Sequence, residues 1–199
     1  MLNHTNGFTI GLLTKNYFEV LQTFKNIIVN EINITEKNFI LSSKCLNQQK
    51  ILILDITFNL QNELTINECN KNKLLNINNT NYLFYKQNTD LKAISFCNHA
   101  DQLHSTTISN NIINFNILLL NNNFYVFIEN ANNQLEVISL NLSFNKLRHD
   151  TYETSENFNI VSLNENNENI FMVGNFDQEN QVITTSYGKT DFFVSEIKL

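Results

Sequence analysis

The sequence predicts an α+β fold built from two similar, strand-rich domains. Hydrophobic residues make up 42% of the 199 residues and aromatic residues 11%, which is enough for a packed core. Sixteen Phe and six Tyr favour strands. The order strand, helix, strand, strand is predicted twice, which indicates an internal duplication. We therefore predict a first domain at 1–115, a connector at 116–134 and an incomplete second domain at 135–199.

The first half opens with a predicted strand at residues 8–13. Residues 17–28 then follow a helical period, because apolar residues such as Val20, Leu21 and Phe24 recur at spacings of three and four. A short helix is also expected at 79–86. Further strands are predicted at 31–35, 38–42, 50–58, 91–96 and 103–108.

The second half repeats this order after strands at 112–120 and 124–128. Phe144 and Leu147 are expected to start a short helix. They repeat the spacing of Phe18 and Leu21, which lie about 126 residues earlier in the chain. The remaining predicted strands are 135–140, 158–163, 169–173, 181–185 and 191–197.

Asn is the strongest bias in composition, at about one residue in five. Pro is absent and Gly occurs four times. Because Asn forms turns and tolerates the left-handed conformation, we expect it to replace Gly and Pro in the connections. The bias is also typical of an AT-rich genome, whose codons favour Asn.

Charge and cysteine content limit the possible functions. The net charge of −6 excludes a generally basic surface for nucleic acid, although a local basic patch is compatible with it. The three cysteines have no paired spacing, which favours a reducing compartment, the cytoplasm or the nucleus. No secretory signal is visible at the start, and the longest apolar runs are far too short to span a membrane.

The order and spacing of these segments resemble the DNA sliding-clamp superfamily, which includes proliferating cell nuclear antigen. The stretch FTIGLLTKNYFEVLQTFKNIIVNEINITEKNFILSS resembles the family's opening strand, inner-ring helix and hairpin, and IFMVGNFDQENQVI resembles a strand–turn–strand of its second domain. Residues 128–144 resemble the end of the connector and the entry to that domain. The sequence departs from the family at Ser43 to Leu46, where a Ser-x-Asp turn is usual, and in its short second domain.

The resemblance implies a non-enzymatic processivity or accessory factor without a cofactor. Such a factor binds double-stranded DNA without sequence preference, forms a homo- or hetero-oligomeric ring, and tethers a polymerase or another replication or transcription protein. The implied DNA-binding residues are Lys15, Lys25, Lys86, Lys146, Arg148 and His149. The implied partner groove contains Leu46, Ile53, Val126 and Ile128. A solvated helix face explains the first set equally well, and plain core explains the second.

Catalytic and metal-binding patterns are weak. Cys97, His99, Asp101 and His104 form a ligand-like cluster, but they fall on an expected hairpin turn and no second Cys/His pair completes a zinc site. We therefore expect no metal. No nucleophile elbow, Walker sequence or HExxH motif is present. Two scattered carboxylates could still meet in space.

An all-β propeller is the alternative fold. Asn followed by an aromatic or apolar residue recurs at intervals of about 43 residues, a spacing typical of propeller blades, at Asn38-Phe39, Asn81-Tyr82, Asn123-Phe124 and Asn169-Ile170. The segment DFFVSEIKL also resembles the closing strand of a bacterial propeller repeat. This fold predicts a protein-interaction module. The helical period at 17–28 and the shortage of Gly argue against it. A β-sandwich enzyme is a third alternative with no motif in its favour.

Overall fold

A computed structural model describes residues 2–4, 7–13, 18–25, 27–35, 37–45, 48–67, 69–97, 101–154, 158–166, 169–176 and 191–197. Eighteen strands and no helix are formed by these residues. The fold is therefore all-β, and the α+β fold predicted from the sequence is wrong.

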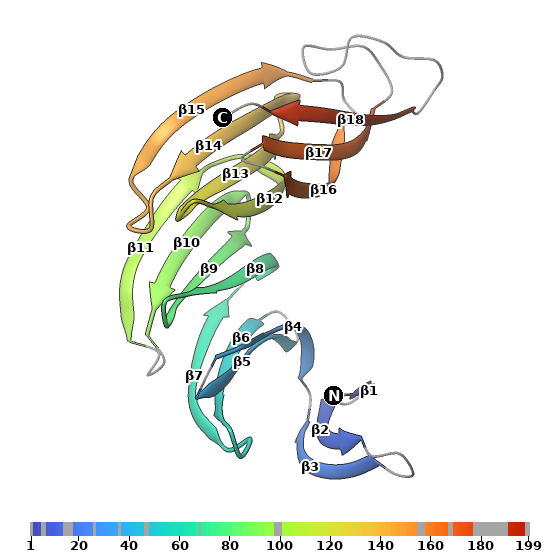
Figure 1. The fold of residues 1–199 in the computed structure, drawn as a ribbon, viewed down its shortest axis with the longest axis vertical. Helices are drawn as coiled ribbons and strands as arrows, with labels where there is room; N and C mark the ends of the chain where they lie inside the picture. The colour runs from blue at the N-terminus through green and yellow to red at the C-terminus, as the bar shows by residue number, and fades with distance from the viewer. Residues whose placement is uncertain are drawn as a thin grey trace. The chain divides into compact units, whose positions relative to one another are not determined.

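The strands form five antiparallel sheets, in each of which neighbouring strands follow one another along the chain (Figure 1). Sheet A contains β1 Leu2–His4, β2 Gly7–Leu13 and β3 Phe18–Lys25. Sheet B contains β4 Ile28–Ile34, β5 Asn38–Cys45, β6 Gln48–Asp55 and β7 Leu60–Asn67. Sheet C contains β8 Cys69–Ile77, β9 Thr80–Gln87, β10 Asp90–Phe96 and β11 Gln102–Ser109.

Sheets D and E form the remainder of the chain. Sheet D contains β12 Ile112–Leu120, β13 Asn123–Asn130, β14 Gln134–Leu140 and β15 Lys146–Glu153. Sheet E contains β16 Asn159–Asn166, β17 Asn169–Phe176 and β18 Asp191–Ile197. Sheets B, C and D are four-stranded meanders of the kind that forms propeller blades. The strand predicted at 181–185 lies outside the described residues.

The chain divides into two compact units, Met1–Ile108 and Ser109–Leu199. In the first unit a core between sheets A and B contains Phe8, Ile10, Val29, Leu41, Leu52 and Leu54. A second core joins sheets B and C and contains Ile40, Ile51, Ile53, Ile66, Cys69, Leu74, Leu83, Tyr85, Ile94 and Phe96. In the second unit the core between sheets D and E includes Phe127, Leu135, Val137, Phe158, Ile160, Ile170, Met172, Phe176 and Phe193.

Asn supplies most of the left-handed turn positions, as the composition predicted. Nine described residues other than Gly have a positive φ, and seven of them are Asn. The pairs Asn78–Asn79 and Asn121–Asn122 close two-residue hairpins with positive φ at both positions, as a type I′ turn requires. Asn therefore takes the role that Gly has in most propeller-type hairpins.

The helix predicted at 17–28 is the strand β3, and a β-bulge explains the error. Gln22 pairs with Ile10 and Val20 pairs with Gly11, so Leu21 is an additional residue. An additional residue changes the alternation of a strand into a spacing of three, which imitates a helix.

The same error occurs at the helix predicted from Phe144. Arg148 pairs with Ser139 and Lys146 pairs with Leu140, so Leu147 is the additional residue of a bulge in β15. The third predicted helix, at 79–86, is β9, in which residues 82–85 are all buried and show no alternation.

The sliding-clamp resemblance is therefore wrong. The segments that imply the inner-ring helices are strands of blade-like sheets. The alternative repeat is the one that the fold uses, because its Asn residues lie in the first two residues of β5, β9, β13 and β17.

Candidate functional site

A pocket of about 180 Å³ opens beside the outer strand of sheet D, within the second unit. Its walls are Tyr125 on β13, Val137 and Ser139 on β14, Arg148, Asp150 and Tyr152 on β15, and Ile197 on β18.

The strand register brings the polar residues of this pocket onto one face of sheet D. Ser139 lies opposite both Tyr125 and Arg148, and Val137 lies opposite Asp150. Residues two apart on a strand point to the same face, which places Arg148 and Asp150 side by side. The lining combines the apolar side chains of Val137 and Ile197 with hydroxyl, guanidinium and carboxylate groups.

Arg148 and Asp150 form an ion pair with an Nε–Oδ2 distance of 2.5 Å. Their side chains are 57% and 33% exposed, so solvent screens the pair. Exposed ion pairs contribute about 0–1 kcal/mol to stability. Both charges are therefore available to a bound partner without large loss of stability.

The pocket occupies positions that are apolar core in sheet B. By register, Ile40, Ile51 and Ile53 of sheet B correspond to Tyr125, Val137 and Ser139 of sheet D. Likewise Asn62, Leu64 and Ile66 correspond to Arg148, Asp150 and Tyr152. In sheet B the four isoleucines belong to the core shared with sheet C, and Leu64 packs against that core. In sheet D, Val137 belongs to the core shared with sheet E, and Tyr125 and Tyr152 pack against it. The joint therefore differs most where Ser139 replaces Ile53 and Asp150 replaces Leu64, and there the pocket opens.

Two pairs of neighbouring sheets, B with C and D with E, are also connected by the same pattern of polar contacts. Glu31 Oε2 accepts a hydrogen bond of 2.8 Å from the Leu74 N–H, and Asn33 Nδ2 donates one of 3.0 Å to the Leu74 carbonyl. Both backbone groups of one inner-strand residue are therefore bound by the preceding sheet.

Ile160 has the same arrangement in the second unit. Its N–H donates to Glu129 Oε1 at 2.9 Å, and its carbonyl accepts from Asn116 Nδ2 at 3.1 Å. These bonds satisfy backbone groups on the outer edges of β8 and β16. They connect sheet B to sheet C and sheet D to sheet E.

A second pocket, of about 390 Å³, lies beside β4 and β8, the first strands of sheets B and C. It is lined by Asn30, Glu31, Lys71, Asn72 and Lys73. Glu31 is already bound to Lys73 Nζ and to the Leu74 N–H. The pocket is wide and exposed, and its carboxylate belongs to the joint described above, so it is the weaker candidate.

In sheets B and D a five-residue turn joins the third and fourth strands, and its ends are joined by a backbone hydrogen bond from Asp55 to Asn59 (3.0 Å) and from Asn141 to Asn145 (3.0 Å). In sheet C the Cys97 N–H donates in the same way to the Asp101 carbonyl (3.1 Å), and residues 98–100 lie outside the described residues. Asp55 Oδ1 and Asn141 Oδ1 accept further bonds from within their turns.

A Phe with positive φ occupies the fourth position of two of these turns and packs on a neighbouring ring. Phe58 (φ 66°) lies 4.7 Å from Phe39 between ring centroids, and Phe144 (φ 62°) lies 6.1 Å from Phe124. Phe39 and Phe124 are the aromatic residues of two of the Asn-aromatic repeats, so these contacts give both a packing role.

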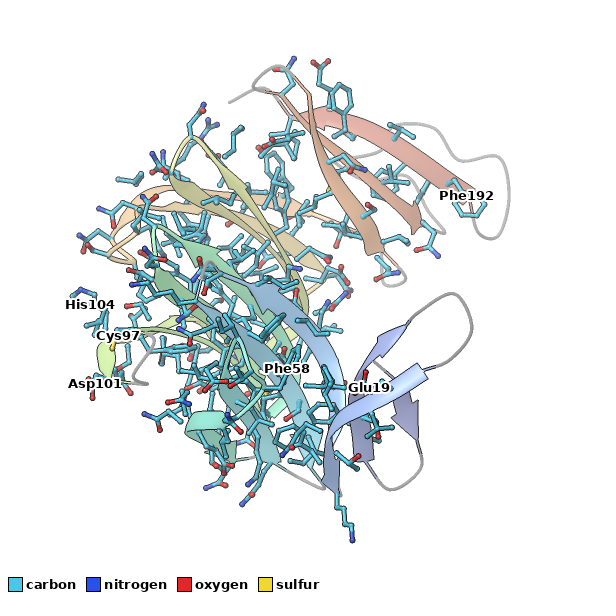
Figure 2. All side chains as sticks on the ribbon, turned by 60° about the horizontal axis from the view of Figure 1, so that its bottom comes forward. Glu19, Phe58, Cys97, Asp101, His104 and Phe192 are labelled. Carbon is cyan, nitrogen blue, oxygen red and sulfur yellow. The ribbon has the colours of Figure 1, made fainter. Side chains whose placement is uncertain are left out.

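The ligand-like cluster lies at the corresponding turn of sheet C. Cys97 Sγ is 3.7 Å from Asp101 Oδ2, and exposed His104 follows on β11 (Figure 2). His99 lies outside the described residues. No three His, Cys, Asp or Glu side chains in the described part of the chain are close enough together to hold a metal ion.

The six basic residues predicted to bind DNA do not share a helix face. Lys25 ends β3, Lys86 lies in β9, and the other described ones lie in β15. Arg148 and His149 point to opposite faces of that strand and pair with Asp150 and Glu136. Lys15 lies outside the described residues.

The predicted partner groove is not at the surface where the structure describes it. Ile53, Val126 and Ile128 are each 0% exposed. Leu46 lies outside the described residues. No sequence signal pointed to Tyr125, Ser139 and Tyr152, since their significance appears only when sheets B and D are aligned by register.

A Ser–Glu–His cluster in the second unit lacks the order of a catalytic triad. Ser109 Oγ is 3.3 Å from Glu136 Oε2, and His149 Nε2 is 3.2 Å from the same oxygen. In a triad the imidazole stands between the hydroxyl and the carboxylate, so that it can take the hydroxyl proton. Here the carboxylate stands between the other two.

Comparisons with known proteins assign no family. No protein-family model matches the chain, and no curated protein matches it. Among solved structures, a protein of unknown function from Bacteroides caccae is 13% identical with a TM-score of 0.46, and covers 81% of this chain and 62% of that one. BBS1N, solved in complex with ARL6DN, is 6% identical with a TM-score of 0.49 over 80% and 53%.

The WD40 domain of SCAP from fission yeast is 10% identical with a TM-score of 0.35, over 90% of this chain and 69% of that one. The chain thus spans 62% and 53% of the length of the first two structures. The sequence contains no Trp, so the Trp-Asp signature of WD40 repeats is absent.

No helix in the described ranges has the length and apolar character needed to cross a membrane. The described residues form blade-like antiparallel sheets. These sheets match the propeller alternative and not a DNA clamp, and a pocket with polar lining opens beside sheet D in the second unit.

Proposed function

We propose that the protein is a non-enzymatic protein-interaction module, and that the pocket beside β15 receives a side chain of the partner. The observation that carries this proposal is an exchange at equivalent register positions: Ile40, Ile53 and Ile66 of sheet B are Tyr125, Ser139 and Tyr152 in sheet D, and Leu64 is Asp150. A residue exchange that weakens a core without other benefit is removed by selection for stability, so an open polar joint indicates a function.

Size and chemistry support a protein partner over a metabolite. Small-molecule sites have volumes of roughly 300–1,000 Å³. The pocket, at about 180 Å³, is smaller and suits one side chain. Tyr and Arg are the residue types enriched at energetic hot spots of protein interfaces. The thiols of Cys69 and Cys97 are compatible with a reducing compartment, where we place the protein.

Peptide selection tests the proposal. A displayed library of random peptides is selected on the purified protein, and the affinity of each enriched peptide is measured by fluorescence polarisation. Ser139→Ile introduces the residue that sheet B has at this position, and it fills the pocket without exposing core. We expect it to weaken binding at least about tenfold, which is about 1.4 kcal/mol.

Leu147→Ala is the matched control, because Leu147 lies on the neighbouring strand β15 and is 57% exposed but is not part of the pocket. It should leave binding unchanged. Peptides that bind Ser139→Ile and the parent protein equally well would show that the pocket is not the binding site.

A further inference from the structure

The second pocket, beside β4 and β8, is lined mainly by groups that donate hydrogen bonds. Its two lysines and one glutamate give the lining a net charge of +1, on a chain whose net charge is −6. The Glu31 carboxylate accepts from Lys73 Nζ at 2.5 Å and from the Leu74 N–H at 2.8 Å. The negative charge of Glu31 is therefore compensated within the protein, and the lining presents ammonium and amide groups to a ligand.

A chain of buried hydrogen bonds fixes the orientation of the Asn72 amide at this pocket. Gln49 Nε2 donates to Ser42 Oγ at 2.7 Å, and Ser42 Oγ donates to Asn72 Oδ1 at 2.7 Å. Gln49 is 1% exposed and Ser42 is 0% exposed, so water does not compete for these bonds. Because the amide oxygen of Asn72 faces Ser42, the Nδ2 donor lies on the other arm of the amide, away from the core.

The backbone of β8 adds a donor on the same side. The Leu74 N–H points from the outer edge of β8 to Glu31 on β4. Alternate residues of an antiparallel strand direct their backbone groups to the same edge, and the register of β8 with β9 is regular between Asn72 and Leu74. The Asn72 N–H therefore projects from that edge as well.

The equivalent joint of the second unit is apolar where this chain of hydrogen bonds lies. By register, Ser42 corresponds to Phe127 and Gln49 corresponds to Leu135, and both of these apolar residues belong to the core between sheets D and E. A buried hydroxyl or amide stabilises a core less than a well-packed apolar side chain does. The polar pair therefore indicates a role beyond packing, and its visible effect is to orient Asn72.

We propose that the pocket beside β4 and β8 binds a small anionic molecule through a phosphate or carboxylate group. Ammonium and N–H donors form strong, charge-assisted hydrogen bonds with such oxyanions. The volume of about 390 Å³ also falls within the range of roughly 300–1,000 Å³ that is typical of small-molecule sites. The inference goes beyond the proposed function, because the two pockets share no described residue.

Isothermal titration calorimetry of the full chain tests the site, with inorganic phosphate and succinate as the probes. Ionic strength is held constant, because salt screens exposed charges. The probe that binds more tightly identifies the oxyanion. Lys71→Gln should weaken binding at least about tenfold, since it removes a charge from the lining. Asn72→Asp should do the same, because it keeps the acceptor for Ser42 and replaces the Nδ2 donor with a negatively charged oxygen.

Lys50→Gln is the matched control. Lys50 also pairs with a glutamate in the first unit, at 2.6 Å from Glu63, but it lies outside the pocket. The control removes the same charge as Lys71→Gln and should leave the affinity unchanged, as should Ser139→Ile in the other pocket. Equal weakening by Lys50→Gln and Lys71→Gln would mean that the probe responds to overall charge, and would overturn the inference.

A measurement on the parent protein needs no variant and therefore does not depend on how each variant folds. On addition of the tighter-binding probe, the largest changes in amide chemical shift should be those of residues 71–74. Changes centred elsewhere in the chain would overturn the proposed site. Binding of neither probe below about 10 mM would overturn it as well.

Discussion

Sheets B and C meet at one joint, and sheets D and E meet at another. Equivalent register positions are filled by different residues in the two joints. In the first, Ile40, Ile51 and Ile53 are completely buried against sheet C. In the second, Tyr125, Val137 and Ser139 line a pocket. Sheet C carries a fourth strand and the described part of sheet E does not. The difference teaches that one register position can hold a buried isoleucine in one joint and a pocket-lining polar residue in another.

The energies of the two joints should differ accordingly. Burying an isoleucine side chain contributes about 1.5–3 kcal/mol. Ser139, at 8% exposure beside the pocket, contributes much less apolar area than Ile53 at 0%. The first joint is therefore expected to carry stability, while the second carries recognition.

The largest expected effect comes from exchanging the two joints. Ile53→Ser should lower the free energy of unfolding of the first unit by about 3–5 kcal/mol, because it leaves a cavity and buries a hydroxyl group. Ser139→Ile should change stability by less than about 1.5 kcal/mol, since the side chain enters space that is already open. Urea unfolding followed by tyrosine fluorescence measures both.

Ile53→Val serves as the control, with an expected loss of about 0.5–1.5 kcal/mol. A similar loss for Ile53→Ser and Ser139→Ile would show that the two joints are packed equally well and would contradict the comparison.

A smaller effect is expected from the carboxylates that bind the inner strands. Glu129, which is 7% exposed, and the more exposed Glu31 each accept a hydrogen bond from the backbone of the next sheet. Glu129→Ala should lower unfolding free energy by about 1–3 kcal/mol, because it leaves the Ile160 N–H buried without this acceptor. Glu31→Ala should lower it by about 1 kcal/mol.

Glu63→Ala is the matched control, because Glu63 forms an exposed ion pair with Lys50 and bridges no sheets. It should change the urea midpoint very little. If Glu31→Ala proves more destabilising than Glu129→Ala, burial does not decide the strength of these joints.

The strands were largely predictable from sequence, whereas the helices and the site were not. The segment 112–120 was predicted as a strand with the bounds that β12 has, because its apolar run and flanking Asn residues are clear signals. Segments 17–28 and 144–150 failed because bulges at Leu21 and Leu147 imitate helical spacing. A local pattern cannot distinguish a bulge from a helical turn, since the partner strand that defines the bulge is distant in sequence.

The pocket could not be predicted for a related reason. Tyr125, Ser139 and Tyr152 are unremarkable residues of alternating strands when each is considered by itself. Their meaning arises from a comparison with Ile40, Ile53 and Ile66, which requires strand register in two sheets. The repeat of about 43 residues permits this alignment, but the helical period at 17–28 favours the other fold.

The smallest expected effect is a difference in pH dependence between two equivalent turns, one in sheet B and one in sheet D. The Thr57 hydroxyl, together with the N–H groups of Thr57 and Asn59, donates to Asp55 and holds the pKa of that carboxyl below its usual value. Asn141 has the corresponding position in sheet D and does not titrate.

Because the pKa of Asp55 is lower in the folded protein than in the unfolded chain, its ionised form stabilises the fold above the unfolded pKa of about 4. This contribution disappears as the pH falls through the folded pKa. Asp55→Asn, which copies sheet D, should therefore reduce the fall in the urea midpoint between about pH 6 and about pH 3. Asn141→Asp should increase that fall, since it adds a carboxylate to the second turn. An unchanged pH dependence in both variants would mean that the turn bonds are equally strong with a neutral acceptor.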